Sequence, residues 1–141
     1  MRADSLAKQK WKNRFTYVKT IPFDETALRS KGARFQIVKF LPQTAIEPHY
    51  HKNVTEIFYI RSGNGILRIN NKEFRCKPDD FFLCEPGDMH EFLNDTDQEF
   101  IILIFKTNES AEDIFFQAKP SCNPLSFEQA SFFRKNSRKP S

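Results

Sequence analysis

The sequence predicts a single all-β domain, built as a sandwich or barrel of antiparallel strands. From the thirties to about residue 106, short runs of β-branched, aromatic and aliphatic residues alternate with turn residues. The 16 phenylalanines, set against four glycines, two methionines and one tryptophan, give the aromatic-rich composition that strands favour. A chain of 141 residues can bury one modest core, so we expect no second full domain.

The expected strands follow one another closely and are separated by turn signals. Gly and Asn in residues 62–65 and 70–71 tolerate the positive φ angles of tight hairpins. Segments rich in Pro and Asp after residues 76, 84 and 94 indicate longer connections. The expected strands are residues 34–40, 48–51, 56–60, 65–70, 72–76, 80–84, 89–94 and 99–105.

Beyond Lys106 the pattern changes from strands to segments that are compatible with short helices. Residues 107–118 form one such segment and residues 124–135 another. In the second, Ser126 and Gln129 have the spacing of a capping box. This helix, with Phe127, Phe132 and Phe133, could form a lid or an oligomer contact, or simply pack on the outside of the barrel. We therefore expect three parts: a basic N-terminal segment (1–23), a β-barrel (24–107) and a C-terminal helical extension with a basic tail (108–141).

The basic character of the chain is confined to its ends. The whole chain carries a formal charge of +4, whereas residues 1–23 carry +5 and residues 134–141 carry +4, so residues 24–133 carry −5. A basic end can bind a nucleic acid or an anionic membrane, but it is more often a solvated tail. With an acidic body, we do not expect a nucleic-acid partner.

The three cysteines indicate a reducing compartment. Cys76, Cys84 and Cys122 are odd in number and lack CxxC spacing, so neither a disulfide framework nor a cysteine zinc site is indicated. We expect Cys84 to be buried and inert. The first residues lack the apolar stretch of a secretion signal, and no window of about 18 apolar residues could span a bilayer. The expectation is a cytoplasmic protein without a membrane partner.

Strand geometry brings the first candidate site residues together. Successive side chains of a strand point to opposite faces, so His49 and His51 share one face and Tyr50 points away. After a short turn, Glu56 shares a face with Phe58 and Ile60. Because a carboxylate among apolar neighbours is costly unless it is paired or bound to a metal, this arrangement indicates a metal site.

The third histidine fits the same site. His90 shares a strand face with Phe92 and Asn94, so every histidine of the chain is expected to face the core. A lone inward histidine is more often a hydrogen-bonded core residue than a ligand, but the His-x-His pair with an inward glutamate favours a metal. The expected pocket-lining residues are Phe58, Ile60, Phe92, Asn94 and Glu47.

Two motifs carry a resemblance to the cupin family. The first is His49-x-His51-x4-Glu56-x6-Gly63, and the second is Pro86-Gly87-x-x-His90-x3-Asn94. The resemblance covers about residues 35–105 and implies a jelly-roll barrel, also called a double-stranded β-helix. It implies that His49, His51, Glu56 and His90 bind one divalent metal. Three motif positions depart from the family pattern: Gln43 and Asp79 replace glycines, and Glu85 replaces a proline.

The implied metal centre allows several functions. Three imidazoles and one carboxylate leave two adjacent positions open on a six-coordinate ion, where water, dioxygen or a bidentate substrate can bind. The ligand types favour Fe(II) or Mn(II), with Ni(II), Zn(II) and Cu(II) as alternatives. One hypothesis is a metal-dependent enzyme of the dioxygenase, isomerase, epimerase or decarboxylase type that acts on a small oxygenated molecule. The other is a non-catalytic module that binds a sugar or organic acid. The family resemblance also implies a homodimer.

Overall fold

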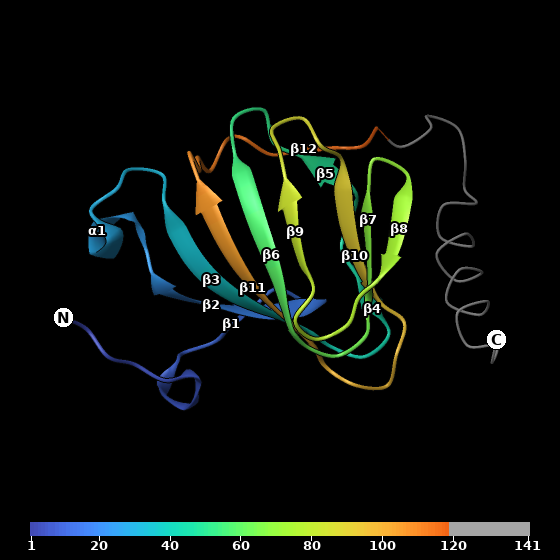
Figure 1. The fold of residues 1–141 in the computed structure, drawn as a ribbon, viewed down its shortest axis with the longest axis horizontal. Coiled ribbons are helices and arrows are strands. Elements are labelled where there is room, and N and C mark those ends of the chain that lie inside the picture. Colours follow the sequence, from blue (N-terminus) through green and yellow to red (C-terminus); the bar gives the residue numbers. More distant parts are fainter. Residues whose placement is uncertain (119–141) are drawn as a thin grey trace.

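The computed structural model describes residues 1–118 of the chain, and these residues form two facing β-sheets (Figure 1). The first sheet has the strand order β1-β2-β3-β11-β6-β9, and the second has the order β12-β5-β10-β7-β8, with β4 pairing to β10. Every pairing between described strands is antiparallel. The predicted antiparallel jelly-roll barrel is confirmed.

The strands of the first sheet, called sheet A, are β1 (Lys12–Asn13), β2 (Tyr17–Phe23), β3 (Arg34–Phe40), β6 (Thr55–Ser62), β9 (Phe81–Cys84) and β11 (Phe100–Thr107). Those of the second, called sheet B, are β4 (Thr44–Ala45), β5 (His49–Tyr50), β7 (Ile66–Ile69), β8 (Lys72–Arg75), β10 (His90–Asn94) and β12 (Phe115–Phe116). A 3-10 turn (Leu6–Lys8) and the four-residue helix α1 (Glu25–Leu28) are the helical elements of the described residues.

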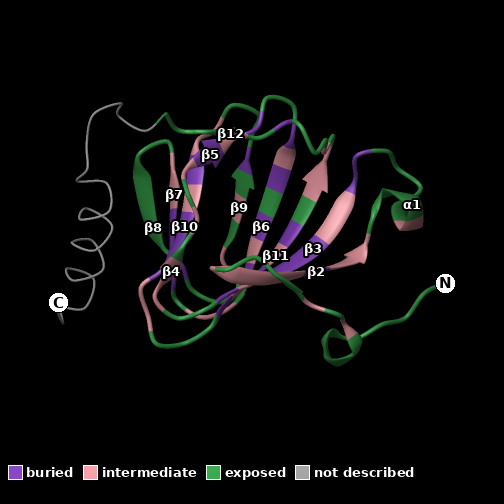
Figure 2. Cartoon of the chain, turned by 180° about the vertical axis from the view of Figure 1, so that it is seen from behind, coloured by how far each residue is buried: buried purple, intermediate pink, exposed green. Residues whose placement is uncertain are grey.

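The core lies between the two sheets and is built from the inward side chains that strand alternation selects. In β6, Glu56, Phe58 and Ile60 are buried, whereas Ile57 and Arg61 are exposed, and Figure 2 shows this alternation along the strand. Each buried phenylalanine removes a large apolar area from water, which stabilises the facing sheets. The largest fully buried apolar side chains are Phe40, Phe58, Phe92, Phe100, Ile60, Leu67 and Ile102.

All eight expected strands are present, with ends that differ by at most two residues. The strand β2 was not expected. Its residues belong to the segment that the sequence groups as a basic N-terminal region, yet they pair with β3 from Tyr17↔Phe40 onward. Pro22 and the mixed polarity of residues 17–23 give no clear strand pattern in the sequence. Lys19 of this strand lines the interior cavity described below.

Residues 107–118, expected to be helical, contain a turn and the strand β12 instead. β12 pairs with β5, placing Phe115 opposite Tyr50 and Phe116 opposite His49. The Phe115 and Tyr50 rings stack with centroids 5.3 Å apart. Pairing with an open strand edge and this ring contact favour the extended backbone over a helix. The second expected helix, with Ser126, Gln129 and the three phenylalanines, lies outside the described residues, as does Cys122.

Candidate metal centre

Two strands and one loop bring the histidines together inside the barrel. His49 on β5 lies directly opposite His90 on β10 in the antiparallel pairing, and His51 follows β5 by one residue. All three are buried, and one ring nitrogen from each lies within 4.8 Å of the other two. The structure thus gathers the three histidines that strand alternation placed on inward faces.

Backbone carbonyls fix the protonation of the three rings. Nδ1 of His49 lies 2.8 Å from the carbonyl oxygen of Glu47, and Nδ1 of His90 lies 3.1 Å from that of Asp88. Nδ1 of His51 contacts the carbonyl oxygen of Asp113. Because a carbonyl oxygen only accepts hydrogen bonds, these contacts place the proton of a neutral ring on Nδ1 and leave the lone pair on Nε2, the atom that would bind a metal. Without a metal, Nε2 of His90, 3.0 Å from Oε2 of Glu56, can instead carry a proton towards that carboxylate. This is the arrangement that backbone partners give to metal-ligating histidines.

The surroundings of His49 also favour its neutral imidazole. Burial, followed by the neighbouring charge of His90, lowers the pKa of His49 to about 4. At neutral pH the ring of His49 is therefore unprotonated at Nε2 and can donate its lone pair to a cation.

The carboxylate of Glu56 completes the cluster from the opposite sheet. Its Oε2 lies 3.0 Å from Nε2 of His90 and 3.6 Å from Nε2 of His51, and its Oε1 lies 2.9 Å from Nζ of Lys106. Burial acts to raise the pKa of Glu56, but the contacts from His90 and Lys106 outweigh it and lower the pKa to about 2. Glu56 is therefore an anion inside the barrel.

The donor atoms fit a divalent transition metal. Among the described residues, Oε2 of Glu56 and Nε2 of His51 are buried and have no hydrogen-bond partner. Buried polar atoms of this kind are rare unless an ion or a ligand satisfies them. Three imidazole nitrogens and one carboxylate oxygen could hold Fe(II) or Mn(II), as well as Ni(II), Zn(II) or Cu(II).

Cys84 lies beside this cluster. Its Sγ is 3.2 Å from Nδ1 of His90, and burial, with a contribution from Glu56, raises the pKa of the thiol to about 12. The thiol is therefore protonated at neutral pH. Cys76 and Cys84 are the free cysteines of the described residues, and both are buried, as expected for Cys84.

A cavity of about 460 Å³ opens next to the cluster, a volume within the range of small-molecule sites. Of the expected lining residues, Glu47, Phe58 and Phe92 line it. Ile60 and Asn94 do not, because each lies one inward position deeper along its strand than Phe58 or Phe92. Ile60 is fully enclosed in the apolar core.

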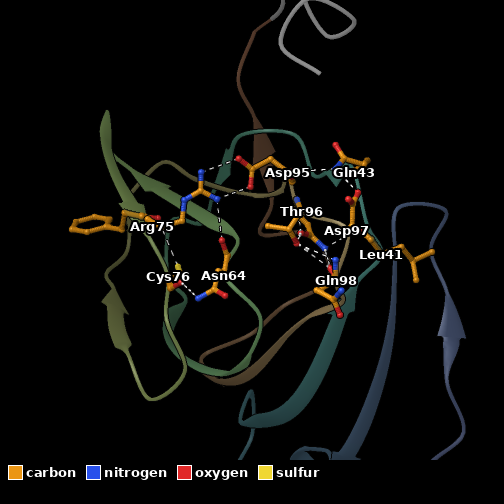
Figure 3. A network of polar contacts seen from close by, with 11 residues as sticks. Leu41, Gln43, Asn64, Arg75, Cys76, Asp95, Thr96, Asp97 and Gln98 are labelled. Atoms are coloured by element: carbon orange, nitrogen blue, oxygen red, sulfur yellow. Dashed lines mark hydrogen bonds and ion pairs between the residues drawn. The ribbon is translucent and has the colours of Figure 1, made fainter. Parts of the chain in front are cut away.

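Asn94 is instead the centre of a hydrogen-bond network at the far end of β10 from His90. Its Nδ2 donates to the carbonyl oxygens of Phe40, Leu41 and Gln98 at 3.2, 3.1 and 2.7 Å. Its Oδ1 accepts from the backbone N–H and the hydroxyl of Thr96 at 3.1 and 2.7 Å. Figure 3 shows the adjoining loop, which Arg75 and Gln43 also hold through Asp95. Asn94 is thus a structural residue.

Two residues of the site were missed from the sequence. Lys106 continues the inward row of β11 after Ile102 and Ile104, so strand alternation could have identified it. Asp113 lies far from the histidines in sequence. Besides its carbonyl contact to His51, its carboxylate accepts the backbone N–H groups of Lys52 and Asn53 at 2.7 and 2.8 Å. No pattern in the sequence indicates this contact.

We predict that Asp113→Ala weakens metal binding about 10-fold. This is the lower end of the loss in affinity seen when a residue that orients a metal ligand is removed. The variant leaves two backbone N–H groups without their acceptor and loosens the loop that carries His51. Metal competition titration would measure the change, with Glu112→Ala, an exposed neighbour, as the control. Equal affinities of the two variants would contradict a positioning role for the Asp113 carboxylate.

The described geometry agrees with a family match. Residues 36–106, half of the chain, match the family model of the cupin domain. The chain belongs to the cupin family. At the two positions where the family pattern has glycine, Gln43 and Asp79 adopt positive φ angles of 59° and 74°, the backbone region that glycine adopts most readily. At Asp79 the side chain accepts a hydrogen bond from the hydroxyl of Tyr59.

This cupin resembles several known proteins. It is 31% identical over 80 residues to the oxalate-binding protein of Thermotoga maritima; the match covers 55% of this chain and 66%, just under two thirds, of that protein. Among solved structures, the polyketide cyclase RemF from Streptomyces resistomycificus has a TM-score of 0.77 at 15% identity, covering 92% of this chain and 93% of that one. A predicted oxalate decarboxylase from Thermotoga maritima has a TM-score of 0.71 at 19% identity, covering 75% and 98%. At these identities the structures show a shared fold.

Within residues 1–118 of this cupin, the helices are too short to cross a membrane.

Proposed function

We propose that this cupin binds one divalent transition metal through His49, His51, Glu56 and His90 and uses the adjoining cavity to take up a small oxygenated molecule. One observation carries the proposal. Three buried imidazoles, each with its Nδ1 on a backbone carbonyl, lie together beside a buried carboxylate, and Nε2 of His51 and Oε2 of Glu56 have no hydrogen-bond partner among the described residues. Electron-pair donors placed this close together repel one another unless a cation lies among them.

When bound, a metal such as Fe(II) or Mn(II) supplies Lewis-acid or redox chemistry at the cavity wall. The chain's own residues then prepare the site. The ammonium of Lys106 at 2.9 Å keeps Glu56 ionised and oriented through its second oxygen. Phe58 and Phe92 exclude water from one side of the cavity, which strengthens electrostatic interactions between the site and a bound molecule.

The leading function is a metal-dependent enzyme of the oxygenase, isomerase, epimerase or decarboxylase type. The enzymes among the structural neighbours, which include a polyketide cyclase, support this reading. The alternative is a binding module without turnover, and the oxalate-binding relative supports it. Both functions need the same metal site and differ in whether a bound molecule is converted.

Elemental analysis of tag-free protein tests the metal site that both functions need. We expect about one transition metal per chain after purification or after reconstitution with Fe(II) or Mn(II). Absence of stoichiometric metal in both preparations would disprove the metal site. Incubation of the loaded protein with catechols, thiols, keto acids and sugars then separates the two functions, because only an enzyme gives turnover that is lost in His49→Ala.

The expected homodimer and the cytoplasmic location stay predictions. The outer face of sheet A offers a surface for a second copy, because β9 is the last strand of the sheet and the face exposes Ile57, Phe81, Leu83 and Phe105. Such a contiguous apolar surface is uncommon on a monomer. We predict that Leu83→Glu converts the dimer to a monomer in light scattering, whereas Lys72→Glu on exposed β8 does not. A wild-type protein that remains monomeric at high concentration would contradict the dimer.

A further inference from the structure

The cavity has a second polar wall that the metal proposal leaves unexplained. Lys19 on β2, Gln36 on β3 and Lys106 on β11 line the same cavity as the three histidines. Their strands are adjacent in sheet A, and the register places them on one inward face, with Lys19 opposite Val38, Gln36 opposite Ile104 and Lys106 opposite Arg34. One wall of the cavity therefore carries polar side chains from three neighbouring strands.

The cations of this wall differ in how they are neutralised. Lys106 pairs with Glu56, and Arg34 pairs with Glu109 at 2.7 Å. Lys19 has no carboxylate within ion-pair distance among residues 1–118.

The surroundings of Lys19 are positive. Burial lowers the pKa of Lys19, and the nearby charges of Arg14, Lys106 and Arg34 lower it further, against a single opposing acid, Glu109. An anionic group of a ligand would offset this potential, since opposite charges in a partly buried site attract more strongly than in water.

Gln36 adds a second unsatisfied group. Its side chain is 5% exposed, and its Oε1 has no hydrogen-bond partner among the described residues. A buried polar atom without a partner costs about 1–3 kcal/mol. Because an amide oxygen accepts hydrogen bonds, the missing partner is a donor such as a hydroxyl group.

We propose that the cavity binds an elongated hydroxycarboxylate, with its carboxylate on Lys19, a hydroxyl donating to Oε1 of Gln36, and further oxygens directed towards the histidine cluster. This inference rests on the proposed small-molecule function and names its ligand class. Lys106, already paired with Glu56, separates the carboxylate subsite from the cluster.

The separation of the two subsites sets the length of the ligand. In sheet A, β2 lies three strands away from β6, which carries Glu56. Three strand spacings correspond to about 14 Å between backbones, and the side chains that extend into the cavity shorten this span. Oxalate, with its oxygens on two adjacent carbons, is short for a span of several strand spacings, so we expect a longer chain such as a six-carbon hydroxycarboxylate, which the cavity of about 460 Å³ can hold.

Gluconate and sorbitol are matched probes, because they share a six-carbon hydroxylated chain and differ in the carboxylate. Calorimetry on the metal-loaded full chain should show gluconate binding at least about 10-fold more tightly than sorbitol, the scale of one well-placed charged contact. Lys19→Met should abolish this preference. Gln36→Leu should weaken both probes several-fold while leaving their ratio unchanged. Lys72→Met, which removes an exposed strand lysine outside the cavity, should match the wild type.

The outcomes separate this inference from the metal proposal. Unaltered gluconate preference in Lys19→Met, or wild-type protein that does not bind gluconate, would overturn the hydroxycarboxylate site. The metal content of the same samples is measured independently by elemental analysis. Wild-type protein that takes up no metal on reconstitution but binds gluconate through Lys19 would support this site and refute the metal proposal.

Discussion

His51→Ala is expected to reduce metal affinity by more than about 100-fold while the barrel stays folded. Removing a residue that only orients a metal ligand typically lowers metal affinity by about 10- to 100-fold, and this variant removes a proposed ligand itself. The fold should tolerate the change because His51 lies just beyond β5 and its Nε2 makes no hydrogen bond within the described residues. Elemental analysis measures the metal content, and circular dichroism with thermal unfolding measures the fold.

Asn53→Ala is the matched control for His51→Ala. Asn53 is exposed on the same loop, and its contact to Asp113 uses a backbone N–H that alanine retains. We expect this control to bind metal like the wild type. Full metal content in His51→Ala would show that the ligand set is wrong, whereas loss of metal in both variants would show that the loop conformation, and not the imidazole, governs binding.

Glu56→Gln is a less direct test of the same site. It removes the negative charge that faces the buried ammonium of Lys106, whose side chain is 13% exposed. An unpaired buried charge destabilises the fold, so loss of metal in this variant would combine two causes. His51 has no such charged partner on its Nδ1 side, where the carbonyl oxygen of Asp113 accepts a hydrogen bond from Nδ1–H.

The proximity of the four candidate ligands could be predicted because successive side chains of a strand alternate between its two faces. His49 and His51 share a face by spacing alone, and the same rule places Glu56 on the inward side of β6 and His90 on that of β10. The apolar neighbours of each residue then indicate which face is buried. These steps need local sequence only, and they identified a cluster whose members come from both sheets.

Depth and distant contacts could not be predicted in this way. Alternation says that Phe92 and Asn94 face inward, but not that the cavity ends between them. Alternation also does not predict the contact between Asp113 and the backbone of Lys52, because that contact depends on the pairing of β12 with β5. Lys19 was assigned to a basic tail because charge along the sequence does not reveal which strand a lysine joins. The missed residues are thus those whose position is set by tertiary pairing.

Asn94→Ala tests whether Asn94 lines the cavity, as expected from the sequence, or holds the adjoining loop through hydrogen bonds, as described above. The variant removes the donor contacts of Nδ2, whose two hydrogens are shared among three carbonyl oxygens, and two accepted hydrogen bonds inside the barrel. At about 1 kcal/mol net for each bond, we expect the free energy of unfolding to fall by about 3–5 kcal/mol. Urea unfolding measures this change, with Asn64→Ala as the control, because exposed Asn64 donates a single long side-chain bond of 3.2 Å to the carbonyl of Cys76.

The folded Asn94→Ala protein should keep its metal and its ligand affinity, since Asn94 lies four residues from His90 along β10, about 13 Å, and outside the cavity. An unchanged unfolding midpoint together with weaker ligand binding would contradict the structural role and return Asn94 to the pocket. The distinction matters for the second motif as a whole. Its histidine lies in the histidine cluster and its asparagine joins β10 to the turn at residues 95–98, so one short motif positions both the candidate site and the strand that carries it.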